Sequence, residues 1–115
     1  MTLLVVEETA AMCRLIRSVI AGLPVTVIEC RDGRDVLPLC RAFDPDWVVI
    51  DLDLVLADAL ATVRSIRQAH AAIRIAVLGE DSPRVREAAE RAGARAYLLK
   101  ENLLALTALL AAENA

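Results

Sequence analysis

Aromatic residues and histidine are scarce in this sequence. Trp, Tyr and Phe make up 3% of the 115 residues, one of each, and there is a single histidine. The 16 acidic residues outnumber the 13 basic ones, so the formal net charge is −3. Such a chain has few rings to stack on bases and no positive surface for a phosphate backbone. We therefore expect no direct nucleic-acid binding by this domain.

Long hydrophobic runs are also missing, although 57% of the residues are hydrophobic and 25% are charged. No run approaches the roughly 20 apolar residues that span a bilayer, and the chain opens without a basic leader. We therefore expect no membrane segment and a cytoplasmic location. The hydrophobic content suits one buried core, and the length suits one domain, residues 1–115.

The residues that commonly carry metal or nucleotide chemistry form no recognisable motif. Cys13, Cys30 and Cys40 lack C-x-x-C spacing, which predicts buried free thiols. His70 is isolated at the end of a helical segment and cannot build a zinc site alone. The four glycines are far apart, so G-x-G-x-x-G and the P-loop pattern are both absent. These absences exclude the usual zinc and nucleotide-binding loops.

Short apolar segments alternate along the chain with longer segments of helical periodicity. The short segments are hydrophobic nearly throughout, which is typical of strands buried on both faces. They are residues 3–6, 25–28, 47–50, 73–78 and 96–99. Between them, hydrophobic residues recur at three- and four-residue spacing, as in amphipathic helices. The alternation predicts a doubly wound α/β domain with a parallel sheet.

Glycine, serine and proline mark the expected helix ends. Gly22 and Gly93 stand where helix C-caps belong. Ser82 precedes Pro83, which places a capping hydroxyl before a proline at the first helical position.

Charged residues follow the carboxyl ends of the predicted strands, where open parallel sheets bind their ligands. Glu7 and Glu8 follow the first strand, and Asp51 and Asp53 follow the third. Lys100, the only lysine of the chain, follows the fifth. A compact ammonium group suits a carboxylate or a phosphoryl oxygen. Taken singly, these residues are equally compatible with solvated loops, so only their joint pattern indicates a site.

This pattern resembles the receiver domain of two-component response regulators, and the resemblance covers the whole chain. Residues 46–54, DWVVIDLDL, resemble the family's phosphoacceptor segment, and residues 93–100, GARAYLLK, are similar to its last-strand signature. The resemblance implies a flavodoxin-like (βα)5 fold with strand order 2-1-3-4-5 in a single domain. It also implies a role in bacterial two-component signalling.

The resemblance further implies phosphoryl transfer to Asp51 from a sensor histidine kinase or a phosphotransfer protein. Mg²⁺ would be held by Glu7, Glu8, Asp51 and the backbone carbonyl of Asp53, because this hard cation takes oxygen ligands. Lys100 would pair with Asp51 at rest and with a phosphoryl oxygen afterwards. Any enzymatic activity would be limited to self-phosphorylation and self-dephosphorylation of Asp51, with no metabolic reaction.

One further residue matches the family pattern, and several depart from it. Tyr97 matches the aromatic position whose ring moves inward on activation and remodels the face formed by the fourth helix, fifth strand and fifth helix. Gly79, however, stands where the family has Thr or Ser, and Val55 stands where it has proline. Glu8 is one methylene longer than the expected aspartate. Two hypotheses therefore stay open: a phosphoryl-accepting switch, and an atypical receiver that acts as a phosphorylation-independent interaction or dimerisation module.

The last helical segment, residues 103–112, is apolar nearly all round. Only one side of such a helix can lie on a sheet, and Leu103, Leu106 and Leu110 suit that side. Leu104 and Leu109 are then expected to face outward. This surplus apolar surface predicts a homodimer contact, or contact with an output domain, through that helix.

Overall fold

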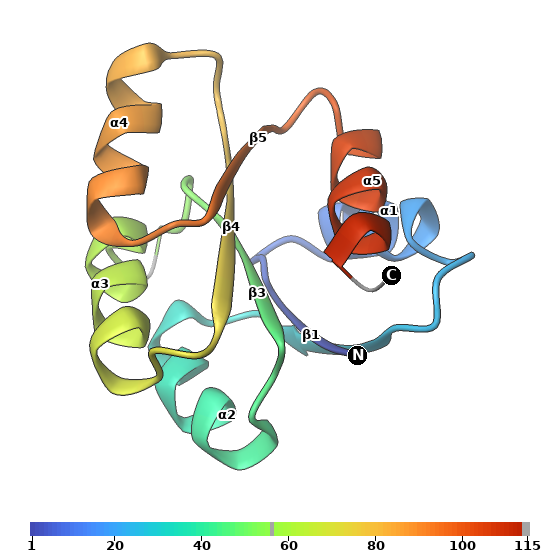
Figure 1. Cartoon of the computed structure of the whole chain (residues 1–115), viewed down its shortest axis with the longest axis horizontal. Coiled ribbons are helices and arrows are strands. Elements are labelled where there is room, and N and C mark those ends of the chain that lie inside the picture. Colours follow the sequence, from blue (N-terminus) through green and yellow to red (C-terminus); the bar gives the residue numbers. More distant parts are fainter. Residues whose placement is uncertain (56, 114–115) are drawn as a thin grey trace.

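The computed structural model describes residues 1–55 and 57–113, and strands and helices alternate along them (Figure 1). The strands are β1 (Thr2–Val6), β2 (Thr26–Cys30), β3 (Trp47–Asp51), β4 (Arg74–Gly79) and β5 (Ala96–Leu99). The α-helices are α1 (Ala10–Val19), α2 (Val36–Phe43), α3 (Ala59–Ala69), α4 (Pro83–Ala92) and α5 (Leu104–Glu113), and a short 3-10 helix, Gly33–Asp35, precedes α2. The predicted α/β alternation is confirmed.

The five strands form one parallel sheet in the order β2-β1-β3-β4-β5. This is the flavodoxin-like order that the resemblance implied. The register pairs Val6 of β1 with Ile50 of β3, and Gly79 of β4 with Leu99 of β5. Because all strands run the same way, the residues that follow them gather at one edge of the sheet.

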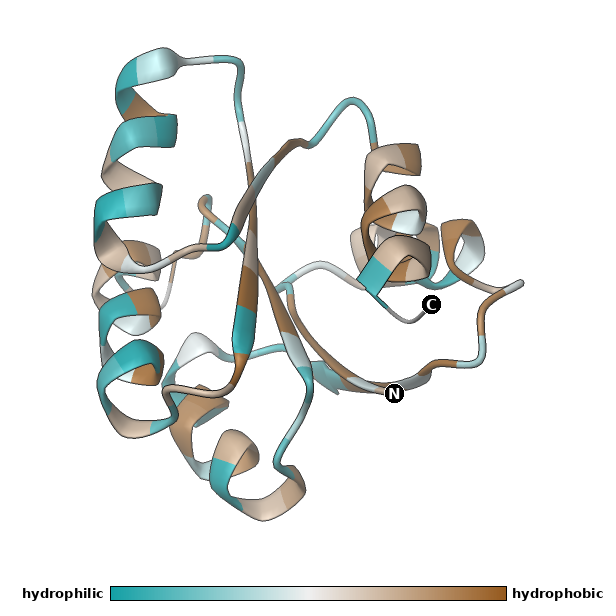
Figure 2. Cartoon of the chain, viewed as in Figure 1, coloured by the Kyte–Doolittle hydropathy of each residue, from teal (hydrophilic) through white to brown (hydrophobic). Residues whose placement is uncertain are grey.

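Helices cover both faces of the sheet, with α1 and α5 on one side and α2, α3 and α4 on the other (Figure 1). Successive strand residues point to opposite faces. In β3, Val48 and Ile50 join the core under α2, α3 and α4, whereas Trp47 and Val49 join the core under α1 and α5. Figure 2 shows hydrophobic colour along the strands and hydrophilic colour on α3 and α4.

Helix starts follow the predicted capping chemistry. The side chain of Ser82 accepts a hydrogen bond from the backbone N–H of Val85 at the start of α4, and Pro83 occupies the first turn. Asp58 and Thr9 cap α3 and α1 in the same way. Gly93 ends α4 with a φ of 120°, a value that side chains disfavour.

The other predicted glycine cap is wrong. Helix α1 ends at Val19, with Ile20 as its C-cap, and Gly22 lies in the turn beyond. Ile20 is 2% exposed and belongs to the core under α1 and α5. Leu23 donates its backbone N–H to the carbonyl of Ile20, so the chain already turns there. Burial of Ile20 therefore sets this helix end two residues before the glycine.

Two strands are displaced from their predicted bounds, because backbone pairing and not hydrophobicity defines a strand. β2 begins one residue later and extends to Cys30, since Val5 and Val6 pair with Glu29 and Cys30. β4 extends to Gly79, which pairs with Leu99. Gly79 is therefore the last residue of a buried strand.

Helix α5 lies beside α1, and the hydroxyl of Thr107 donates to the backbone carbonyl of Val19 at 2.6 Å. Leu104 is 69% exposed, as predicted. Leu109 is half-buried and packs against the core under α1 and α5, so its prediction as an outward residue is wrong. The neighbouring α1 covers part of the surface that a single amphipathic helix would leave open.

The buried environment of the three cysteines is confirmed, and all three are free thiols: Cys13, Cys30 and Cys40. In the described part of the chain, no helix combines the length and the hydropathy that crossing a bilayer requires.

Candidate functional site

The central carboxylates come from two neighbouring strands. Asp51 is the last residue of β3, and Glu7 directly follows β1. Both are 4% exposed, and they are the buried charged residues of the described chain. β1 and β3 pair in register up to Val6 and Ile50, so the next residue on each strand reaches the same point of the edge. The fold therefore brings Glu7 and Asp51 together.

Asp51 is held from two directions. Its Oδ1 atom accepts the backbone N–H of Asp53 at 2.9 Å, and its Oδ2 atom lies 2.9 Å from the Nζ atom of Lys100. Burial raises the pKa of the Asp51 carboxyl, but hydrogen bonds from Glu7, from the Asp53 N–H and from Lys100 outweigh burial. The net pKa lies below its ordinary value, so Asp51 is ionised at neutral pH.

Glu7 has the opposite protonation behaviour. Its Oε1 atom accepts the backbone N–H and the hydroxyl of Thr9, at 3.0 and 3.2 Å. Its Oε2 atom is buried without an N–H or O–H donor among the described residues. Burial, followed by the hydrogen bond with Asp51, raises the pKa of Glu7 from 4.5 to about 7. Glu7 therefore keeps its proton to a higher pH than an ordinary glutamate does, beside ionised Asp51.

Lys100 lies between two aspartates. Its Nζ atom is 2.9 Å from Asp51 and 2.9 Å from the Oδ2 atom of Asp53. Burial lowers the pKa of Lys100, but the hydrogen bonds with the two carboxylates raise it above its ordinary value. The Asp53 side chain is 76% exposed, whereas that of Asp51 is 5% exposed. The ammonium group thus links the buried carboxylate to the surface.

Glu8 extends toward the segment after β3. Its Oε1 atom accepts the backbone N–H of Val55 at 2.6 Å. Among the described residues, no three Asp, Glu, His or Cys side chains already stand in an arrangement that could hold a metal ion. Of the predicted metal-ligand side chains, the structure thus brings Glu7 and Asp51 into direct contact and places Glu8 on the loop.

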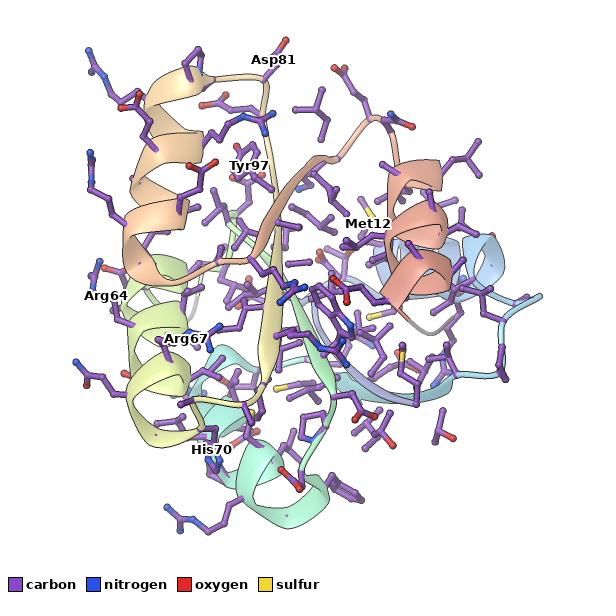
Figure 3. All side chains as sticks on the ribbon, viewed as in Figure 1. Met12, Arg64, Arg67, His70, Asp81 and Tyr97 are labelled. Carbon is purple, nitrogen blue, oxygen red and sulfur yellow. The ribbon has the colours of Figure 1, made fainter. Side chains whose placement is uncertain are left out.

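The space that a side chain at position 79 would occupy is filled by the ring of Tyr97. The Tyr97 side chain is 6% exposed and lies between α4 and the sheet (Figure 3). Its Cζ atom lies 2.8 Å from the place that a Cβ atom on Gly79 would take. The Ser82 hydroxyl accepts the backbone N–H of Val85 and caps α4.

An open cavity of about 350 Å³ lies beside the carboxylates. Leucine, valine and alanine form its apolar part, and carboxylates contribute the polar part; its residues are Leu52, Asp53, Asp58, Ala59, Leu60, Glu80 and Val85. The cavity gives solvent and small molecules a route to the edge of the sheet.

Two supporting residues were not predicted as part of the site. Thr9 holds Glu7 through its backbone N–H and hydroxyl, and a threonine before a helical segment is a recognisable capping signal. Arg86 stacks over the Tyr97 ring, with 5.0 Å between the guanidinium carbon and the ring centroid. No local sequence signal connects α4 to β5 in this way.

The arrangement can support chemistry at Asp51. A carboxylate that stays ionised at neutral pH can act as a nucleophile, and Lys100 supplies positive charge next to it. Oxygen atoms from Glu7 and Asp51 are ligands that a hard divalent cation accepts.

Residues 3–111 match the family of the response regulator receiver domain. The chain belongs to the response regulator receiver domain family. No curated protein sequence matches it. Among solved structures, a LuxR-family two-component response regulator from an Aurantimonas species is 28% identical, with a TM-score of 0.83, over 96% of this chain and 85% of that chain.

Two further solved receivers share the fold at lower identity. The Mn²⁺-bound form of the response regulator Rcp1 is 21% identical, with a TM-score of 0.77, over 92% of this chain and 88% of that one. The RcsB response regulator of Salmonella typhimurium is 18% identical, with a TM-score of 0.87. That alignment covers 100% of this chain and 62% of RcsB. The receiver identified from the sequence is therefore confirmed at the level of family and fold.

Proposed function

We propose that this receiver domain accepts a phosphoryl group on Asp51 from the phosphohistidine of a sensor histidine kinase or a phosphotransfer protein. The observation that carries the proposal is the contact between buried, ionised Asp51 and Lys100 at 2.9 Å. In an ordinary surface ion pair both groups are exposed, and in a purely structural buried pair neither group is. In this pair the Asp51 side chain is buried, whereas the Lys100 side chain is partly exposed to solvent.

In the proposed reaction, a carboxylate oxygen of Asp51 attacks phosphorus and the N–P bond of the phosphohistidine breaks. Asp51 needs no base, because its pKa is already held below the ordinary value. The freed imidazole of the donor keeps the electron pair of the broken bond. The Asp51 carboxyl gives up its own charge in the new acyl phosphate bond, and the ammonium of Lys100 then pairs with a phosphoryl oxygen.

Glu7, Glu8, Asp51 and the backbone carbonyl of Asp53 are the proposed Mg²⁺ ligands. The buried Oε2 atom of Glu7, which lacks a donor among the described residues, fits such a cation. Mg²⁺ usually keeps several waters and needs only one or two carboxylates, so Glu7 and Asp51 meet its minimum. When bound, it would neutralise negative charge on the incoming phosphoryl group. Glu7 must lose its proton first.

Intact mass spectrometry tests the proposal. The protein is incubated with Mg²⁺ and acetyl phosphate, beside Asp51→Asn and a donor-competent receiver as a positive control. We expect one added phosphoryl group on the native chain and none on Asp51→Asn. No added mass on a folded native chain, while the control receiver is labelled, would refute phosphoryl acceptance.

Gly79 specifically favours a second function, an interaction or dimerisation module that works without phosphorylation. Glycine has no hydroxyl to contact a phosphoryl group, and the Tyr97 ring already occupies the space beside it. In this function, Asp51→Asn leaves partner binding unchanged. In the phosphoryl switch, the same substitution abolishes signalling.

The exposed part of α5 is the proposed contact with a second copy of the chain. Leu104 is 69% exposed and carries the apolar surface, with Leu109 contributing from its half-buried position. Sedimentation over a range of concentrations tests this. We expect native protein to self-associate and Leu104→Glu to weaken that association. A native protein that stays monomeric at high concentration would refute the homodimer.

A further inference from the structure

The space next to Gly79 is occupied by the ring of Tyr97, the only tyrosine in the chain. A Cβ atom built on Gly79 would lie 2.8 Å from the Cζ atom of Tyr97 and closer still to its hydroxyl oxygen. Gly79 lies in β4 with a backbone conformation open to any residue, since Gly93 is the glycine with positive φ among the described residues. Space, and not backbone geometry, therefore limits position 79 to glycine as long as the Tyr97 ring stays inward.

The ring is held by contacts from three directions. Its hydroxyl donates to the backbone carbonyl of Glu80 at 2.6 Å, which connects β5 to the loop between β4 and α4. Arg86 of α4 stacks over the ring, with 5.0 Å to its centroid. The ring also belongs to the core under α2, α3 and α4. Moving it outward would break the hydrogen bond and leave a buried void beside Gly79.

We propose that Gly79 acts as a steric latch that keeps Tyr97 permanently inward. A side chain at position 79 and the inward ring cannot share this space, so a larger residue at 79 would displace the ring from its inward position. Glycine has no side chain that could compete with the Tyr97 ring for this space. The loop between β4 and α4 and the face formed by α4 and β5 are therefore held in one arrangement, whatever the chemical state of Asp51.

This latch differs from the proposed phosphoryl acceptance and does not depend on it. Asp51 and Lys100 contact each other without Tyr97, whereas Tyr97 bonds to Glu80 and Arg86. A receiver that fails to accept a phosphoryl group can still hold its ring inward. The test of the latch therefore uses the tyrosine itself and no phosphodonor.

The single tyrosine gives a direct readout by NMR with ¹³C-labelled tyrosine and by nitration with tetranitromethane. The variants are Gly79→Ala and Gly79→Thr. Gly22→Ala is the matched control, because a Cβ atom there meets nothing within 4 Å. We expect Gly79→Thr to shift the Tyr97 ring resonances and to speed nitration by about tenfold, as when a minor outward state becomes the major one. The control should match the native chain. Native-like shifts and nitration in Gly79→Thr would overturn the latch.

A double-mutant cycle of unfolding free energies tests the proposal even if the ring cannot move outward and Gly79→Thr unfolds. Gly79→Ala is measured by urea unfolding in the native background and in the Tyr97→Ala background. We expect a clear loss of stability with the ring present and a much smaller loss without it. An equal loss in both backgrounds, or unfolding of Gly79→Ala in both, would show that the ring is not what excludes a side chain and would overturn the proposal.

Discussion

Glu7 and Asp51 are buried carboxyl groups at the ends of two neighbouring strands, and the pKa of Glu7 is raised while that of Asp51 is lowered. Neither residue alone predicts this. Two buried carboxylates in contact repel each other when both are ionised, so one of them retains its proton. Lys100 and the Asp53 N–H stabilise the charge on Asp51, which leaves the proton on Glu7. We therefore expect Glu7 to lose its proton when a divalent cation binds to the pair.

The stability of the metal-free protein should fall as pH rises from about 4.5 to about 7. In this range the folded chain retains a proton on Glu7, whose pKa is about 7, while the unfolded chain loses it at 4.5. The folded state then binds more protons, so its advantage declines with rising pH. We expect a loss on the order of 2 to 3 kcal/mol. Urea unfolding in EDTA across this range measures it.

Glu7→Gln is the matched variant for that measurement. The amide keeps a donor next to Asp51 but cannot ionise, so its stability profile should be flat between the same pH values. A Glu7→Gln profile as steep as that of the native chain would mean that another group titrates there.

Mg²⁺ binding should release a proton from the protein near pH 6. Glu7 is mostly protonated at that pH, because its pKa is about 7, and a metal ligand must be deprotonated. Calorimetric titration with Mg²⁺ in two buffers of different ionisation enthalpy measures the number of protons released. We expect release by the native chain and none by Glu7→Gln. Binding without proton release by the native chain would place the cation away from Glu7.

Lys100 and Asp53 should contribute very differently to stability. Lys100→Met leaves buried Asp51 without its cation, and we expect it to cost about 1 to 3 kcal/mol. Asp53→Asn removes only an exposed partner, with a side chain 76% exposed, and should change stability by less than about 0.5 kcal/mol. Urea unfolding of both variants at neutral pH measures the difference. Equal costs would mean that the buried pair does not depend on Lys100.

Arg67 should stabilise the junction between α3 and α4. Its guanidinium donates to the carbonyls of Gly93 and Ala71, at 3.0 and 2.7 Å. Arg67→Met leaves these acceptors unpaired while keeping an aliphatic side chain, and should cost about 1 to 2 kcal/mol.

Arg64 provides the control for this prediction. It is exposed on the same helix, on the outer side of α3, whereas Arg67 lies toward the sheet (Figure 3). Arg64→Met should change the free energy of unfolding by less than about 0.5 kcal/mol. A thermal unfolding series in which the two variants behave alike would contradict the role of Arg67.

The site could be predicted only in part, for identifiable reasons. Asp51 and Lys100 follow apolar segments directly, so their place at the edge of the sheet is a local property of the sequence. The inward position of Tyr97 is not local. It depends on the distance between β5 and Gly79 of β4, which adjacent residues do not encode. The half-buried position of Leu109 is not local either, because it packs against the core under α1 and α5.

The sequence by itself determined the fold class of this protein and the chemical types gathered at one edge. Apolar segments of strand length alternating with helical ones can bury their surfaces only as a covered parallel sheet. The tertiary structure alone decided which charges meet, why the pKa of Glu7 is raised and which residue fills the space at Gly79. These outcomes depend on burial and on contacts between distant segments, and both exist only after the strands have paired.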